Sequence, residues 1–299
     1  VINRKIGDAE ITPNLNRLIK ESAYFNNFHY QVGGGNTSDA EFLCNASQYP
    51  AKEGAVYFRY PVNTYHALPK ALKEQNYNTY VFHAYHPSFW NRTVMYEAVG
   101  FDTFISDKDF EPGEVIGFGL NDTSFFQQSL KKIDKTKPFY GFFVTLSSHY
   151  AFAPFKNYSF DVGEYENTDM GNYIKAANYV DKSIGVMIDE LKKNNLYENT
   201  VLAIYGDHHS FPKGNADEFL KFLGMDNSDF QWISNQKVPF ILHYPGLKNG
   251  EILSTTGGEI DIFPTIANLM GIECPYAFGK DLLNTEKGYA ILRNGSVVT

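Results

Sequence analysis

The chain has 299 residues, which is enough to bury a sizeable hydrophobic core in one large domain. Its hydrophobic fraction of 43% and charged fraction of 20% are typical of a globular protein, which disfavours a disordered or fibrous chain. The formal net charge is −8 and no run of basic residues occurs, so nucleic-acid binding is disfavoured. No apolar run approaches the ~18 residues that would predict a membrane span.

Apolar runs that favour strands alternate with helical patterns along the chain. The expected elements are helices over 12–19, 66–75, 124–133, 173–193 and 260–270, and strands over 24–30, 79–82, 139–146, 200–205 and 240–244. Apolar strands between helices predict an α/β fold with a mixed or parallel sheet covered on both faces. We expect one domain over 1–299, and the sequence allows, without requiring, a small C-terminal subdomain from about Val238.

A glycine-rich turn, Gly33-Gly34-Gly35-Asn36-Thr37-Ser38-Asp39, follows the first expected long strand. Glycines let backbone N–H groups approach an anion closely, and Thr37 or Ser38 suits a helix N-cap. A hydroxyl at a helix N-terminus faces a partial positive charge, and a bound metal would help it to lose its proton and attack phosphorus. Alone, such a turn is more often a flexible loop with an ordinary cap.

A second segment changes that balance. Residues 203–209 read Ala-Ile-Tyr-Gly-Asp-His-His, an apolar strand that ends at a glycine and opens onto Asp207 and His208. Carboxylate and imidazole are common ligands of divalent metals, and open α/β sheets place ligands at the carboxyl ends of strands. With this pair present, we favour Thr37 as a catalytic residue over Thr37 as a simple cap.

The two cysteines, Cys44 and Cys274, leave the redox compartment open. Cys44 lies in an apolar stretch, which predicts a buried free thiol. A disulfide between the two cysteines stays an alternative.

Seven segments of the chain resemble, in the same order, those of the lipoteichoic acid synthases: residues 35–42, 88–92, 145–149, 205–208, 238–241, 261–265 and 293–296. Those synthases belong to the sulfatase and alkaline-phosphatase-like superfamily. The resemblance implies a mostly parallel central sheet with helices on both faces. The Cys-x-Pro-x-Arg signature of sulfatases is absent, and Thr37 stands at the place of the formylglycine, so sulfate ester hydrolysis is not expected.

The resemblance also implies roles for individual residues. Thr37 would be the nucleophile and a metal ligand, together with the metal ligands Asp207 and His208, and the expected ion is Mn²⁺, with Mg²⁺ as the alternative. His149 would contact the substrate phosphate or assist the leaving group. Trp90 and Arg92 would line a glycerol-phosphate pocket. These roles are chemically coherent, because Arg gives phosphate a planar charged fork, His passes protons near neutral pH, and Trp offers a flat apolar wall.

Two departures from the synthases affect these expectations. The synthases carry a further metal ligand, a Glu that ends their first strand a few residues before the point equivalent to Val1. This chain opens with Val1, so we expect an excised domain whose three remaining protein ligands bind metal more weakly. Before Trp90, an acidic residue that would touch the substrate glycerol is replaced by His83-Ala84-Tyr85-His86. We expect His83 and His86 to be surface or packing residues.

The function that this pattern favours is transfer of glycerol phosphate from phosphatidylglycerol to a glycerol-phosphate polymer or a glycolipid acceptor, through a covalent intermediate on Thr37. Three alternatives stay open: a phosphodiesterase or phosphatase that passes the group to water, a phosphoethanolamine transferase, and a metal-free envelope-binding domain. The resemblance places the domain on the extracellular face of the bacterial cell membrane. The membrane anchor of the family lies upstream of its catalytic domain.

Overall fold

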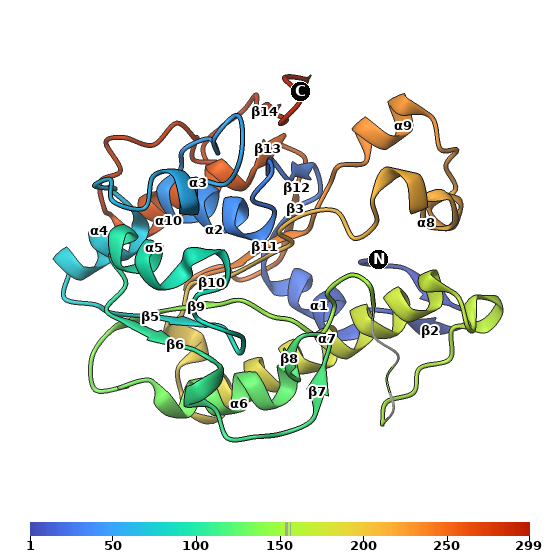
Figure 1. Cartoon of the computed structure of the whole chain (residues 1–299), viewed down its shortest axis with the longest axis horizontal. Coiled ribbons are helices and arrows are strands. Elements are labelled where there is room, and N and C mark those ends of the chain that lie inside the picture. The colour runs from blue at the N-terminus through green and yellow to red at the C-terminus, as the bar shows by residue number, and fades with distance from the viewer. Residues whose placement is uncertain (153–154, 156) are drawn as a thin grey trace.

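Two sheets form the centre of the molecule in the computed structural model, which describes residues 1–152, 155 and 157–299 (Figure 1). The first sheet has three parallel strands in the order β6-β5-β9: β6 (Thr103–Ile105), β5 (Asn78–Phe82) and β9 (Phe139–Phe143). The second has the order β10-β11-β3-β12: β10 (Leu202–Tyr205), β11 (Phe240–His243), β3 (Ala23–Phe25) and β12 (Glu251–Leu253). β11 is antiparallel to both of its neighbours, whereas β12 is parallel to β3. The sheets are therefore parallel in one half of the molecule and mixed in the other.

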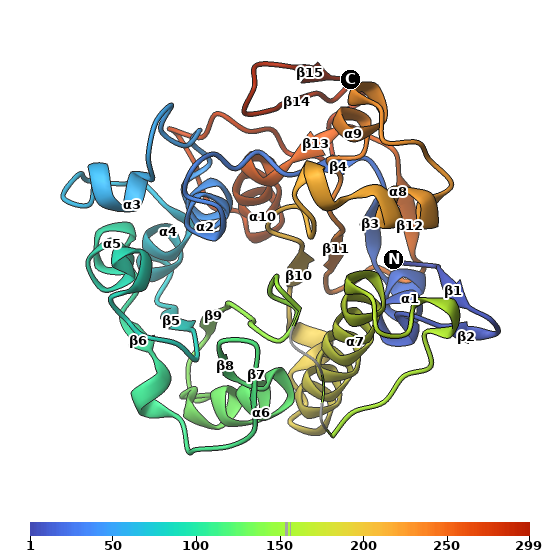
Figure 2. The ribbon, with the colours of Figure 1, turned by 45° about the vertical axis from the view of Figure 1, so that its right-hand side comes forward.

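Four short two-stranded sheets lie around this centre. Their strands are β1 (Lys5–Ile6) with β2 (Ala9–Glu10), β4 (Phe28–His29) with β13 (Gly257–Gly258), β7 (Val115–Ile116) with β8 (Gly119–Leu120), and β14 (Ala290–Ile291) with β15 (Val297–Val298). The last pair forms the C-terminal hairpin at the top of Figure 2.

Helices cover both faces of the central strands (Figures 1 and 2). One side carries α2 (Thr37–Ala46), α3 (Val56–Arg59), α4 (Leu68–Glu74), α5 (Arg92–Val99) and α10 (Ile262–Met270), and the other carries α1 (Pro13–Leu18), α6 (Asp122–Lys132) and α7 (Asp169–Lys193). Two short helices, α8 (Asp217–Leu223) and α9 (Asp229–Ser234), follow β10. None of the helices described is long and apolar enough to cross a membrane.

The alternation of side chains along the strands explains this two-sided packing. In β11, Phe240 and Leu242 belong to the core with α2 and α5, whereas Ile241 belongs to the core with α1, α6 and α7. Successive side chains of a strand point to opposite faces, so a strand that is apolar throughout needs a cover on each side. The predicted α/β fold class is confirmed.

The predicted strand over 24–30 is wrong in one respect. The chain turns at Asn26 and Asn27, so that it forms β3 and β4 rather than one strand. The two pieces pair with different partners, because β3 lies between β11 and β12 while β4 pairs with β13. Asn27 also donates a side-chain hydrogen bond to Thr256, which holds the turn against the segment before β13. The C-terminal subdomain from about Val238 stays a prediction.

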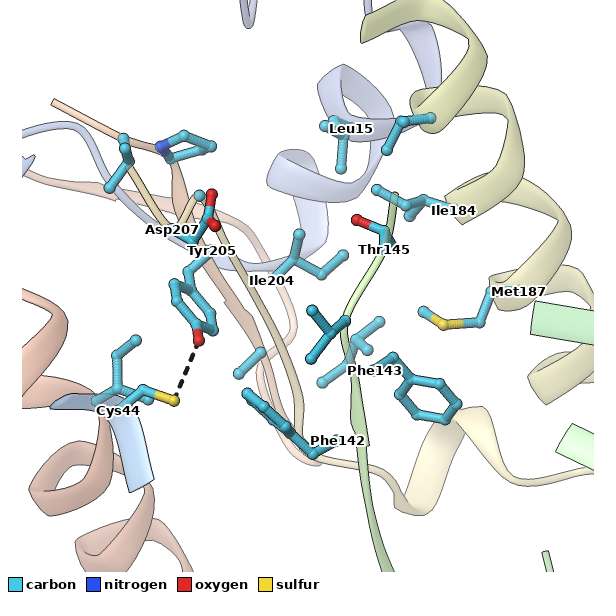
Figure 3. A pocket seen from close by; sticks show the side chains of 18 of the residues that line it. Leu15, Cys44, Phe142, Phe143, Thr145, Ile184, Met187, Ile204, Tyr205 and Asp207 are labelled. Atoms are coloured by element: carbon cyan, nitrogen blue, oxygen red, sulfur yellow. Dashed lines mark hydrogen bonds between the residues drawn. The ribbon is translucent and has the colours of Figure 1, made fainter. Parts of the chain in front are cut away.

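A large cavity separates β9 from β10. Its volume is about 1520 Å³, and its lining includes Phe142 and Phe143 from β9, Ile204 from β10, and Ile184 and Met187 from α7 (Figure 3). In the part of the chain that the structure describes, β9 pairs only with β5 and β10 pairs only with β11. The facing edges of these two strands are therefore not joined by a β-ladder, and mostly apolar side chains lie between them.

Candidate functional site

The glycine-rich turn leads directly into α2. Asn36 is the N-cap residue, with a φ of 44°, and its side chain makes no capping hydrogen bond. Thr37 is the first residue of the helix, and the Ser38 hydroxyl donates to the carbonyl oxygen of Gly35 at 2.8 Å. The Thr37 hydroxyl is therefore not used as a cap and is free to point toward another part of the chain.

Asp39 takes up backbone donors of this turn. Its Oδ2 accepts hydrogen bonds from the N–H groups of Gly33 and Gly35, both at 2.9 Å. Burial raises the pKa of the Asp39 carboxyl, and the two N–H groups act against that rise. A Cβ at Gly35 would lie 2.3 Å from Asp39 Oδ1, so this close approach requires glycine. The N–H groups of Gly33 and Gly35 therefore serve the Asp39 carboxyl of the same turn.

Thr37, Asp207 and His208 meet at the carboxyl end of β10. The Thr37 hydroxyl donates to Asp207 Oδ2 at 2.9 Å and lies 3.3 Å from His208 Nε2, and Asp207 Oδ2 lies 3.2 Å from His208 Nε2. Figure 3 shows Asp207 just beyond Tyr205, at the end of the strand. The Asp207 side chain is 41% exposed, so the group is accessible from solvent.

His208 is oriented through its other ring nitrogen. Its Nδ1 lies 3.0 Å from the carbonyl oxygen of His209, which can only accept a hydrogen bond. Its Nε2 faces Thr37 and Asp207. This is the arrangement that a metal-ligating imidazole needs, because the second nitrogen is oriented by a carbonyl group.

The three donor atoms fit a single divalent ion. Ligands that each lie roughly 2.0–2.2 Å from one metal are about 3 Å apart, and the separations here are 2.9, 3.2 and 3.3 Å. Only two of the three are carboxylate or imidazole groups. Among the described residues, His, Cys, Asp and Glu side chains alone form no group of three that could hold a metal. A metal held here by three protein donors would take its third donor from Thr37.

Arg92 lies at the start of α5 and is held by Glu41 of α2. Its Nε and Nη2 donate to Glu41 Oε1 at 3.0 and 2.7 Å, and both side chains are 2% exposed. The Tyr96 hydroxyl donates to the other carboxylate oxygen of Glu41 at 2.8 Å. Burial is the largest single influence and opposes the charge on Arg92, but Glu41, Tyr96 and Tyr57 together outweigh it, so the pKa of the guanidinium is raised.

Trp90 precedes Arg92 in a tight turn, Phe89–Asn91, where its φ is 56°. Its ring is partly buried and lies 5.9 Å from the ring of Phe58 and 5.8 Å from that of Phe89, between centroids. Trp90, Arg92 and Thr37 all line the large cavity described above. The two predicted substrate residues thus belong to the same cavity lining as Thr37.

His149 is not in hydrogen-bond contact with Thr37, Asp207 or His208 in the part of the chain described here. It is exposed, its ring packs edge-on against Phe118 at 4.5 Å, and its Nδ1 faces the carbonyl oxygen of Tyr150. It lines the same cavity as the other predicted site residues. The structure therefore brings Thr37, Asp207 and His208 together, whereas His149 is an exposed residue of the cavity lining without a hydrogen bond to them among the described residues.

Of the two histidines predicted to be surface or packing residues, one is on the surface and the other is packed inside the protein. His86 is exposed, whereas His83 is buried and its Nδ1 faces the carbonyl oxygen of Val144 at 3.2 Å. Burial, together with the positive charge of Arg92, lowers the pKa of His83 to about 3. His83 is therefore a neutral ring beside the site at physiological pH.

Both cysteines are free, and the Cys44 thiol is buried, as its apolar neighbours predict. It accepts a hydrogen bond from the Tyr205 hydroxyl at 3.1 Å, marked by the dashed line in Figure 3. Burial raises the pKa of this thiol, so it is not a nucleophile at neutral pH.

Sequence reasoning missed Glu41, Tyr96 and Asp39. A signal for the first two was present, because Glu41 lies four residues after Thr37 and Tyr96 four residues after Arg92, which puts each pair on one helix face. The helix that carries Arg92 and Tyr96 was not predicted. Without that helix the spacing could not be recognised.

The chain matches the sulfatase family model over residues 5–272. It is 38% identical over 309 residues to the lipoteichoic acid synthase-like protein YvgJ of Bacillus subtilis, an alignment that covers 100% of this chain and 50% of that protein. The chain thus spans about half the length of the curated relatives it matches.

Solved structures agree with these matches. The crystal structure of the lipoteichoic acid synthase LtaP from Listeria monocytogenes superposes with a TM-score of 0.90 at 33% identity, covering 98% of this chain and 74% of that one. The Streptococcus pyogenes phosphoglycerol transferase GacH, in complex with sn-glycerol-1-phosphate, has the same fold at a TM-score of 0.67 and 18% identity, covering 87% of this chain and 68% of that one. The chain belongs to the sulfatase family and, within it, to the lipoteichoic acid synthases.

Proposed function

We propose that this domain transfers glycerol phosphate from phosphatidylglycerol to a hydroxyl group of a glycerol-phosphate polymer or a glycolipid. The observation that carries the proposal is the position of Thr37, whose hydroxyl lies within 3.3 Å of a carboxylate and an imidazole at the first turn of α2. The names of its relatives, lipoteichoic acid synthase and phosphoglycerol transferase, support the same substrate class.

Thr37, Asp207 and His208 would hold a divalent ion, with Mn²⁺ preferred over Mg²⁺, through the three atoms whose separations fit it. Such an ion lowers the pKa of a bound hydroxyl and offsets negative charge on a phosphoryl group. Asp207 Oδ2 already accepts the Thr37 hydroxyl proton in a hydrogen bond, so it is the nearest acceptor for that proton. The N-terminus of α2 adds a partial positive charge at the same place.

The reaction would then proceed in two steps, transfer of glycerol phosphate to Thr37 and its transfer from Thr37 to the acceptor. The Thr37 oxygen attacks phosphorus, the bond from phosphorus to the diacylglycerol oxygen breaks, and diacylglycerol leaves with a proton. The acceptor hydroxyl next attacks the glycerophospho-threonine, its proton is removed, and the Thr37 oxygen leaves as the restored hydroxyl. His149, an exposed residue of the cavity lining, would exchange these protons with the leaving group and the acceptor.

Arg92 and Trp90 would bind the glycerol phosphate that is transferred. The Arg92 Nη1 has no hydrogen-bond partner among the described residues and would donate to the phosphate. Trp90 would form an apolar wall for the glycerol. We also infer that the domain works on the extracellular face of the cell membrane, where its lipid donor is reached from a longer, anchored protein.

Substitution of the nucleophile tests the proposal. Thr37→Ala should reduce turnover of phosphatidylglycerol labelled in its head group by several orders of magnitude, because the covalent step is lost while the helix remains. Thr93→Ala is the matched control, since Thr93 also lies in the first turn of a helix but its hydroxyl donates to the carbonyl oxygen of Pro87. That control should keep its turnover and melting temperature.

Two results would change the conclusion. Near-normal turnover by Thr37→Ala would show that Thr37 is only the first residue of a helix. Release of free glycerol phosphate alone, in the presence of a glycolipid acceptor, would replace the transferase with a hydrolase that uses the same residues.

A further inference from the structure

Three side chains form a closed polar network between α2 and α5. Arg92 donates twice to one oxygen of Glu41, and Tyr96 donates to the other oxygen. Glu41, Arg92 and Tyr96 are each at most 2% exposed, so solvent does not compete for these bonds. The network therefore fixes the guanidinium plane of Arg92 in one orientation.

The spacing in the two helices links this network to Thr37. Glu41 lies one turn after Thr37 on α2, and Tyr96 lies one turn after Arg92 on α5. Residues four apart lie on the same face of a helix. Glu41 thus connects the helix that begins with the candidate nucleophile to the helix that begins with the candidate phosphate ligand.

One donor of Arg92 remains outside the network. Its Nη1 is buried and has no hydrogen-bond partner among the described residues, and Arg92 lines the same cavity as Thr37 and Trp90. The ring of Phe89 covers part of the guanidinium at 5.8 Å. A buried donor without a partner is costly, and a charged one more so. An arrangement that satisfies Nε and Nη2 and leaves Nη1 without a partner, in a side chain that belongs to the cavity lining, suits a ligand that accepts hydrogen bonds.

We propose that Glu41 is a positioning residue, which holds Arg92 so that its Nη1 is presented to a phosphate group bound at Thr37. This rests on the proposed function, because it assigns the phosphate of the glycerol-phosphate substrate to that donor. The competing explanation is that the pair of Glu41 and Arg92 only stabilises the contact between α2 and α5. The two differ in what happens to phosphate affinity when the network is altered and the fold is retained.

The test measures the affinity for sn-glycerol phosphate by calorimetry, with Mn²⁺ present, alongside the melting temperature. Glu41→Gln should weaken binding by about tenfold, because the guanidinium loses its charged anchor. Glu41→Gln also leaves the charge of Arg92 buried without a counter-charge, which lowers the unfolding free energy of the variant. Tyr96→Phe is therefore the second variant, since it removes one hydrogen bond of Glu41 and keeps the ion pair. It should weaken binding by a smaller factor, about two- to fivefold.

A double variant separates positioning from structure. In an Arg92→Gln background, Glu41→Gln should cause no further loss of affinity, because the group that it positions is already absent. That double variant buries no net charge, which favours its folding over that of either single variant. Asp181→Asn is the matched control, a buried carboxylate that accepts the N–H groups of Asn14 and Leu15 on the opposite side of the sheet. It should lower the melting temperature and leave affinity unchanged.

Different results would contradict the positioning role of Glu41 and the proposed reaction. Unchanged affinity in folded Glu41→Gln or in Tyr96→Phe would overturn the positioning role, and so would a wild-type chain that binds no glycerol phosphate. A further loss of affinity on adding Glu41→Gln to Arg92→Gln would also overturn it. Failure of the wild-type chain to turn over phosphatidylglycerol, with these affinity changes intact, would overturn the proposed reaction and leave the positioning role of Glu41 standing.

Discussion

Helix α2 and strand β10 bring the parts of the candidate site to the same edge of the molecule from very different surroundings. All residues of α2 from Ser38 to Ala46 are buried, and the helix packs against α3, α4, α5 and α10. The four residues of β10 are all partly exposed. One edge of β10 pairs with β11 and the other faces the cavity in Figure 3. Thr37 thus has a fully packed support, whereas Asp207 and His208 follow a strand that is supported on one side.

This difference suggests that the two halves of the site respond separately to perturbation. Regions with few buried apolar contacts open locally at lower free energy than the packed core. The side of the site that carries Thr37, Glu41 and Arg92 should keep its geometry under conditions in which the end of β10 does not. Three experiments can break or sharpen this comparison.

The largest expected effect is on global stability. Leu43→Ala, at a fully buried position of α2, should cost about 2–5 kcal/mol of unfolding free energy, because it leaves a cavity in a packed core. Ile204→Ala, in β10, should cost less, about 1–2 kcal/mol, because that side chain already borders open space. Urea denaturation of both variants measures the two values. Equal losses would show that β10 is as well packed as α2.

A smaller effect should follow from pH. Burial lowers the pKa of His83 to about 3, below its ordinary value of 6.5. At pH values between about 3 and 6.5, the His83 imidazole is protonated in the unfolded chain and neutral in the folded chain. The contribution of His83 to stability is therefore present above pH 6.5 and is lost as the pH falls. The slope is at most about 1.4 kcal/mol per pH unit. His83→Gln should therefore flatten the decline in unfolding free energy between pH 6.5 and 5.

The control for this prediction is His66→Gln, since His66 is exposed. Asp122 acts in the opposite direction, because burial raises its carboxyl pKa to about 6 and favours the folded state as the pH falls toward 4. The test therefore compares the pH dependence of the unfolding free energy of His83→Gln with that of His66→Gln, because Asp122 contributes equally to both. A slope in His83→Gln that equals the wild-type slope would show that His83 is not held neutral by its burial.

The smallest expected effect is local opening of the native protein, which hydrogen exchange detects without global unfolding. In native-state hydrogen exchange, amides of α2 should be protected close to the global unfolding free energy. Amides of β9 and β10 whose N–H groups face the cavity should exchange at a much lower free energy. Mass spectrometry of peptides that cover 139–143 and 202–205, compared with 37–46, gives the three values. Protection of both strands equal to that of α2 would remove the contrast.

Much of the local structure follows from the sequence itself. The predicted helix over 173–193 lies within α7, and the apolar run that ends at Tyr205 forms β10. The free, buried state of Cys44 was also predictable from its apolar neighbours. These features depend on residues within a few positions of one another, through hydrophobic period and turn chemistry. The candidate site residues likewise lie in short segments that can be recognised in the sequence.

Other features were decided only by tertiary structure. The contact of Thr37 with Asp207 joins residues 170 positions apart, and that of Glu41 with Arg92 joins residues 51 apart. The use of glycine N–H groups by Asp39, the turn at Asn26 and Asn27, and the wide separation of β9 from β10 also depend on what packs nearby. Sequence patterns set which face of an element is apolar. They do not set which other element covers that face, because that choice depends on the packing of the whole chain.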